Sequence, residues 1–198
     1  GNKVRHGTVV YLAGEGHHGL RGRVAAWKQH KGVSGLDMWL SRHGLDLNTP
    51  QGYQKTVDAV RALPNPPEII VVDTLHRFLD GDENSASDAK SMLDACGAMI
   101  NEFDCSVILV HHTGVSVEAQ HRARGSSAWR GALDIEISVI PGETIEINQR
   151  KSKDAEEAES VFVELQSVPI KGWLDEDGDQ VSSAVLVAGQ EPVKAKKD

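Results

Sequence analysis

Four side chains capable of acid–base or metal chemistry follow short hydrophobic runs of the sequence. Glu15 comes just after the apolar segment 9–12, Asp73 ends the run EIIVVD, and His111 and His112 end the run SVILVHH. A carboxylate in such a place can polarise a water molecule, and an aspartate can hold a hydrated magnesium ion. A histidine can donate a hydrogen bond to a phosphate oxygen. Together these residue types indicate phosphoryl transfer.

The runs that precede these residues have the length and composition of strands. Continuous apolar and β-branched runs are typical of strands buried on both faces of a parallel sheet, and this applies to segments 9–12, 68–73 and 106–112. Open α/β sheets bind ligands at the carboxyl ends of their strands, so we expect the four residues to share one edge. Alternation along a strand sends adjacent side chains to opposite faces, and of the two histidines we expect His112 to face the site.

Helical periodicity separates the predicted strands. One helix is expected from Leu20 to Gly32, with Leu20, Val24 and Trp27 on one face, and another over 53–63, before the stop signal PNPP. Ser85 and Asp88 can form a capping box for a third helix, whose apolar stripe runs from 89 to 103. The segment 33–47 shows no regular pattern.

The C-terminal third changes to a period of two. The runs IEISVI, TIEIN and VFVELQSV, beyond Asp134, predict antiparallel strands. The fold class expected is therefore α/β, a mostly parallel sheet flanked by helices with an antiparallel C-terminal extension. We expect a single domain over residues 1–190 and a flexible tail over 191–198.

Composition narrows the classes of function. A chain of 198 residues with 39% hydrophobic content can bury one core, and its apolar runs fall short of the roughly 20 residues that cross a bilayer. No signal peptide is visible, and the two cysteines form neither a metal pattern nor a disulfide framework, so we expect a cytoplasmic protein without a membrane partner. The formal charge of -8 requires any nucleic-acid site to be local.

The order of several segments resembles a known family. GTVVYLAGEGHHGLRGRVAAW, IIVVDTLHRFLDGDEN, VILVHHTG and RGSSAWRGALD, followed by RKSKD, are similar to the RecA-like P-loop ATPases of the plasmid RepA replicative helicase type, which are common in phages and plasmids. The resemblance implies a RecA-like P-loop NTPase core that uses ATP and Mg²⁺. By it, Glu15 activates the attacking water, and Asp73 is the Walker B aspartate that holds magnesium through water, with Thr74 beside it at the cofactor. His112, with His111, senses the γ-phosphate.

The resemblance also implies partners. Loops 80–87 and 114–128 stand where the family places segments that face a central channel and single-stranded DNA. The candidates for DNA phosphate contacts are Arg122, Arg124 and Arg130. Candidates for a residue that reaches the neighbouring subunit's nucleotide are Lys151 and Lys153, at the tip of a predicted hairpin, together with Arg124 and Arg130. The implied protein is a hexameric ATP-dependent helicase or translocase subunit that acts in plasmid or phage replication, with other replication proteins as further partners.

One family motif is missing from the sequence. The 198 residues contain no G-x-x-x-x-G-K-[ST] phosphate loop. In the family this Walker A segment precedes the strand at 9–12, so we expect it to lie before residue 1. The alternative is a RecA-like scaffold or DNA-binding module that does not hydrolyse ATP. A further alternative is a metal-dependent hydrolase in which Asp73, His111 and His112 bind a transition metal.

Overall fold

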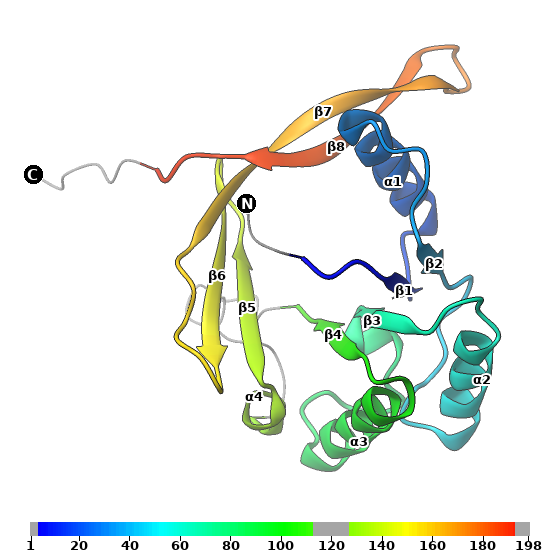
Figure 1. Ribbon diagram of the computed structural model, residues 1–198, viewed down its shortest axis with the longest axis vertical. Helices are drawn as coiled ribbons and strands as arrows, with labels where there is room; N and C mark the ends of the chain where they lie inside the picture. The colour runs from blue at the N-terminus through cyan, green and yellow to red at the C-terminus, as the bar shows by residue number, and fades with distance from the viewer. Residues whose placement is uncertain (1–3, 113–126, 193–198) are drawn as a thin grey trace, which may run out of the picture. The chain divides into compact units, whose positions relative to one another are not determined.

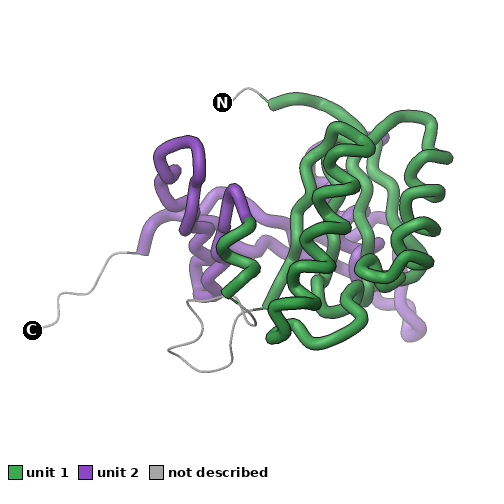
Figure 2. Tube along the Cα trace, turned by 90° about the horizontal axis from the view of Figure 1, so that it is seen from below, with its two compact units in different colours: residues 1–17, 36–132 green, residues 18–35, 133–198 purple. Residues whose placement is uncertain are grey.

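The structure is a computed structural model that describes residues 4–112 and 127–192 (Figure 1). The chain forms two compact units (Figure 2). Unit 1 comprises residues 1–17 and 36–132, and unit 2 comprises residues 18–35 and 133–198. The expectation of a single domain over 1–190 stays a prediction, and most of the predicted tail, residues 193–198, lies outside the described residues.

Unit 1 contains a parallel sheet of four strands in the order β2-β1-β3-β4. The strands are β1 (Thr8–Ala13), β2 (Met38–Leu40), β3 (Pro67–Asp73) and β4 (Ser106–Val110). Three of them match the predicted runs, whereas β2 lies in the segment without a sequence pattern. Its three residues are short of the length at which alternation becomes visible.

Two long helices of unit 1 lie below the parallel sheet in the view of Figure 1. Helix α2 (Pro50–Arg61) begins at Thr49, whose hydroxyl accepts a hydrogen bond from the amide of Gly52. Helix α3 (Ala86–Phe103) begins at Ser85, whose hydroxyl accepts from the amide of Asp88. The Asp88 carboxylate accepts from the amide of Asp82, so only one half of the predicted capping box forms. The described part of unit 1 also contains two short helices, η1 (Leu75–Arg77) and α4 (Ala128–Ala132).

The core of unit 1 lies between the sheet and these helices. Ile70 and Val72 of β3 and Met92 and Met99 of α3 are each 0% exposed. Burying a side chain of this size contributes roughly 1.5–3 kcal/mol relative to leaving it in water. The prediction that the run at 106–112 is buried is wrong, because β4 pairs only with β3 within the described sheet and Ile108 is 47% exposed.

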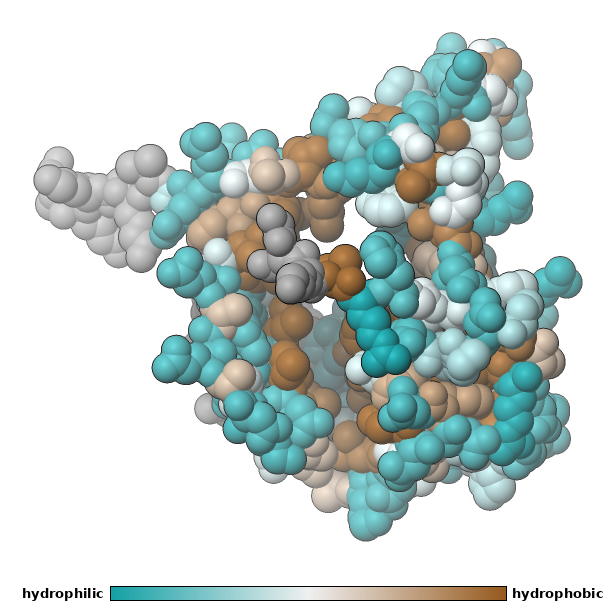
Figure 3. All heavy atoms as spheres, viewed as in Figure 1, coloured by the Kyte–Doolittle hydropathy of each residue, from teal (hydrophilic) through white to brown (hydrophobic). Residues whose placement is uncertain are grey.

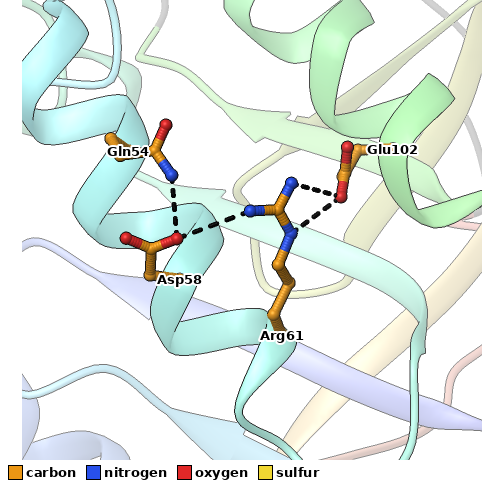
Figure 4. Close-up of polar contacts among 4 residues, drawn as sticks. All are labelled: Gln54, Asp58, Arg61 and Glu102. Atoms are coloured by element: carbon orange, nitrogen blue, oxygen red, sulfur yellow. Dashed lines mark hydrogen bonds and ion pairs between the residues drawn. The ribbon is translucent and has the colours of Figure 1, made fainter.

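An exposed ion pair joins the two long helices (Figure 4). Arg61 of α2 donates from Nε and Nη2 to Oε1 of Glu102 on α3, at 2.8 and 2.6 Å. The same guanidinium lies 3.5 Å from Asp58, which also accepts a hydrogen bond from Gln54. The hydrogen bond to Glu102 raises the pKa of Arg61.

Unit 2 contains an antiparallel sheet in the order β5-β6-β7-β8. Its strands are β5 (Ile135–Ile140), β6 (Ile145–Ser152), β7 (Val161–Leu174) and β8 (Gln180–Ala188). The antiparallel extension is thus confirmed. The sequence pattern did not predict its last strand, β8.

Helix α1 (His17–Lys31) packs on β7 and β8. The buried residues of α1 are Gly22 and Ala26, which bring the helix close to Ile170 of β7. The expected apolar face was wrong, because Trp27 is 38% exposed and the helix instead turns its smallest residues to the sheet. Within the described ranges, every helix is too short or too polar to span a membrane.

The packing of α3 predicts an unreactive cysteine. Burial raises the pKa of Cys96 to about 12. The thiolate is the reactive form, so on the order of one molecule in ten thousand carries it at pH 8. We expect iodoacetamide at pH 8 to leave Cys96 unmodified in the folded protein under conditions that modify it fully in urea, as measured by peptide mass spectrometry. Equal rates in both states would contradict the packing of α3.

Candidate active site

The parallel register of β1 and β3 brings the two predicted carboxylates to one edge of the sheet. Ala13 pairs with Asp73, and the amide of Gly14 donates to the Asp73 carbonyl at 2.6 Å. Glu15 follows directly. On the other side of β3, Asp73 pairs with Val110, the last residue of β4, and the two histidines come next. The structure therefore places the ends of three neighbouring strands, and the residues predicted from them, along one edge.

Asp73 is held by a residue of the neighbouring strand. The Tyr11 hydroxyl donates a hydrogen bond to Oδ2 of the half-buried Asp73. Tyr11 lies two residues before the partner of Asp73, so the two side chains share a face of the sheet. Oδ1 accepts no hydrogen bond from the described residues. Thr74, which follows Asp73 through a cis peptide bond, is 5% exposed. One carboxylate oxygen is thus fixed, and the other is available to a ligand.

Glu15 is held by an arginine that sequence reasoning missed. Arg77, the last residue of η1, donates from Nε and Nη2 to Oε2 of Glu15, at 2.9 and 2.7 Å. The side chains are 45% exposed for Glu15 and 54% for Arg77. Exposed pairs of this kind contribute about 0–1 kcal/mol to stability, so the pair orients Glu15 more than it stabilises the fold. The sequence offered one weak signal, a basic residue four positions after the aspartate that ends the strand.

The backbone around Arg77 is fixed by burial and by close contacts. Leu75 and Phe78 are each 1% exposed, and the Phe78 carbonyl accepts from the amide of Leu47 at 2.8 Å. A Cβ on Gly14 would lie 2.3 Å from Cβ of Arg77, and one on Gly44 would lie 3.2 Å from the Arg77 carbonyl. The absence of side chains at these two glycines lets η1 approach the end of β1. The backbone of Arg77 is therefore fixed, while its guanidinium is exposed.

The two histidines differ in their surroundings. His111 is half-buried, and its ring lies 6.4 Å from the ring of Trp129 on α4, at an interplanar angle of 47°. His112 is exposed. Of the two histidines, His112 is thus the more exposed. Its role as a sensor stays a prediction.

The described residues do not form a transition-metal site. Among them, no three His, Cys, Asp or Glu side chains gather closely enough to hold a metal ion. Asp73, His111 and His112 are all described, so they do not make the cluster that a metal-dependent hydrolase needs. A magnesium ion held through water does not need such a cluster, since Mg²⁺ keeps several waters and takes one or two carboxylates from a protein.

Loop 80–87, which we expect to face DNA, is held by hydrogen bonds to other residues of unit 1. Asn48 accepts from the amide of Asp80 and donates to its carbonyl, both at 2.8 Å. The Trp129 indole donates to the carbonyl of Glu83, a residue only 7% exposed. Hydrogen bonds from the backbone and the side chain of Asn84 lower the pKa of Asp82. The loop carries acidic and no basic side chains, so phosphate contacts depend on other segments.

The predicted basic contacts fall in different places. Arg122 and Arg124 lie outside the described residues, and Arg130 is exposed on α4. The placement of Lys151 at a hairpin tip was wrong, because it lies within β6 opposite Glu136 and its ammonium donates to the Leu133 carbonyl. Lys153 follows the strand and donates to Asp134 at 3.1 Å, which raises the pKa of the lysine. Both lysines are engaged within unit 2.

Comparisons with known proteins point to one family and one fold. The sequence profile of the AAA_25 family, described as an AAA domain, matches residues 1–118. No curated protein sequence matches the chain. Two solved structures are similar at low sequence identity. The crystal structure of the RadB recombinase has a TM-score of 0.54 at 12% identity, over 80% of this chain and 76% of that one.

The second structure is a KaiC-like protein from the hyperthermophilic archaeon Pyrococcus horikoshii OT3. Its TM-score is 0.53 at 11% identity, over 80% of this chain and 72% of that one. At such identities the likeness shows the fold alone. The predicted fold class is confirmed, an α/β RecA-like fold with a parallel sheet flanked by helices and an antiparallel sheet.

The close approach at Gly14 predicts a strong effect of one methyl group. Gly14→Ala forces Cβ of residue 14 against Cβ of Arg77, next to the backbone, where no flexible side-chain end can yield. We expect a loss of about 1–3 kcal/mol in the free energy of unfolding, measured in urea. The matched control is Gly97→Ala in α3, where an added Cβ meets nothing within 4 Å and stability should rise by roughly 0.5–1 kcal/mol. Equal stabilities of the two variants would refute the packing of η1.

Proposed function

The chain belongs to the AAA domain family, and from this premise we propose that it is an ATP-hydrolysing motor subunit that moves on single-stranded DNA. Its fold and family are those of RecA-like P-loop ATPases. The finer assignment in this proposal, a replicative helicase of the plasmid RepA type in phage or plasmid replication, is supported by the ordered segments of the sequence. The proposal includes a hexamer in the cytoplasm, with ATP between its subunits.

One observation carries the proposal of ATP hydrolysis. Glu15 and Asp73 lie at the paired ends of β1 and β3, each with one carboxylate oxygen held by a neighbour. Asp73 offers its second oxygen to a magnesium-bound water, which fits the preference of Mg²⁺ for oxygen ligands. When bound, magnesium neutralises charge on the phosphates. Glu15 offers its second oxygen to the attacking water, which it orients and deprotonates. His112 donates a hydrogen bond to a phosphate oxygen.

Charge supports a local contact with DNA. The protein carries a formal charge of -8, so phosphates must meet a concentrated basic segment. In the sequence Arg122 and Arg124 supply it, and Arg130, which is exposed on α4, is a further candidate. The candidates for action on a neighbouring subunit's nucleotide are Arg124, Arg130, Lys151 and Lys153; of these, Lys151 donates to the Leu133 carbonyl and Lys153 to Asp134.

The proposal predicts separate effects on hydrolysis and binding. In the full-length protein, Glu15→Gln should lower the rate of Mg-ATP hydrolysis by about 100-fold or more, because the amide cannot accept the proton of the attacking water. The affinity for a fluorescent ATP analogue should change by less than about twofold, since Glu15 acts on the attacking water and not on the bound nucleotide.

A second glutamate provides the matched control for this test. Glu68 is also paired with an arginine, at 2.9 Å from Arg5, but it lies near the start of β3, at the opposite end of the strand from Asp73. Glu68→Gln should hydrolyse ATP like the parent. Normal turnover by the Glu15 variant would remove Glu15 from the mechanism.

The hydrogen bond from Tyr11 predicts a change in magnesium dependence. Tyr11→Phe removes the donor that fixes Oδ2 of Asp73. The Mg²⁺ concentration for half-maximal hydrolysis should rise about 3- to 10-fold, because an orienting hydrogen bond contributes roughly 1 kcal/mol. The rate at saturating Mg²⁺ should stay close to that of the parent. An unchanged magnesium titration would show that Tyr11 does not orient the carboxylate.

A further inference from the structure

Arg77 contacts only one oxygen of the Glu15 carboxylate. Its Nε and Nη2 both donate to Oε2, while Oε1 accepts no hydrogen bond from the described residues. A guanidinium can also bind both oxygens of a carboxylate, one with each nitrogen. The arrangement seen here instead fixes the position of Oε2 and leaves the other oxygen free to accept a hydrogen bond from water.

Glu15 has little else to hold it. Glycines stand on both sides of it, and Gly16 adopts a positive φ of 68°. Its side chain is 45% exposed, and a glutamate in such a place samples several rotamers. The side chain therefore depends on Arg77 for its order.

The backbone of Arg77, by contrast, is held firmly in place. The flanking Leu75 and Phe78 are buried, and the amide of Arg77 donates to the Thr74 carbonyl at 2.9 Å. Gly14 gives η1 the space to lie against the end of β1. Since Thr74 directly follows Asp73, the position of the guanidinium is tied to the strand that carries the other carboxylate.

We propose that Arg77 is a positioning residue for Glu15, which holds Oε2 so that Oε1 meets the attacking water. The inference rests on the proposed function, since it assigns Arg77 to the same hydrolytic site. Arg77 does not touch the reacting atoms. It reduces the conformational freedom of the base and so raises the fraction of molecules in which the water is aligned.

The test compares three variants of the full-length protein in steady-state Mg-ATP hydrolysis. Arg77→Gln removes the charge and the forked donor, and kcat should fall about fivefold with KM within about twofold, since an exposed ion pair contributes at most about 1 kcal/mol. Arg77→Lys keeps a cation that can reach the same oxygen, and its kcat should recover to within about twofold of the parent. Arg61→Gln is the matched control. It removes an arginine 50% exposed in an ion pair with a glutamate, and kcat should stay within about twofold.

The outcomes separate this inference from the proposed function. A parent protein that hydrolyses ATP and loses activity in Glu15→Gln, together with an Arg77→Gln variant of normal kcat, would overturn the role of Arg77 alone. A loss in Arg77→Gln that lysine does not restore and that accompanies a lowered melting temperature would also overturn it, since Arg77 would then serve stability. A parent no more active than Glu15→Gln would overturn the proposed function and the role of Arg77 with it.

Discussion

The parallel pairing of β1 with β3 is the constraint on which the rest of the site depends. Its register sets Ala13 opposite Asp73, and the chain leaves both strands at the same edge. A slip of one residue in this register would separate Glu15 from Asp73, because it turns every side chain of the strand to the other face of the sheet. The burial of Ile70 and Val72 against the helices of unit 1 fixes the face that β3 turns to the core and so supports this register.

The two carboxylates at this edge are held in different ways. Asp73 lies half-buried at the end of β3 and receives its hydrogen bond from Tyr11 on the adjacent strand, within the sheet itself. Glu15 lies on an exposed turn between glycines and receives its contacts from the short helix that follows β3. In the proposed mechanism Asp73 is the fixed ligand for a cation and Glu15 is a base that Arg77 orients, which suits phosphoryl transfer because positioning and charge stabilisation supply most of its catalysis.

Local pattern predicted the elements of this fold, and long-range contacts decided what it could not predict. The runs at 9–12 and 68–73 and the stripe of α3 were correctly identified, because a continuous apolar run marks a buried strand and a stripe of period 3.6 marks the buried face of a helix. The exposure of β4 was missed, since an apolar run does not reveal whether a strand has a neighbour on both sides. Tyr11 and Arg77 were missed for a related reason. Each contacts a residue 62 positions away, and nothing in the local sequence indicates such a partner.

The most direct measurement is a crystal structure of the full-length protein with Mg²⁺ and a non-hydrolysable ATP analogue. The account predicts the terminal phosphate at the carboxyl edge of β1, β3 and β4, with magnesium reached from Asp73 through water. It also predicts an ordered water on Oε1 of Glu15, with Arg77 still on Oε2. A nucleotide bound away from this edge, or a Glu15 carboxylate turned from the terminal phosphate, would contradict the central claim.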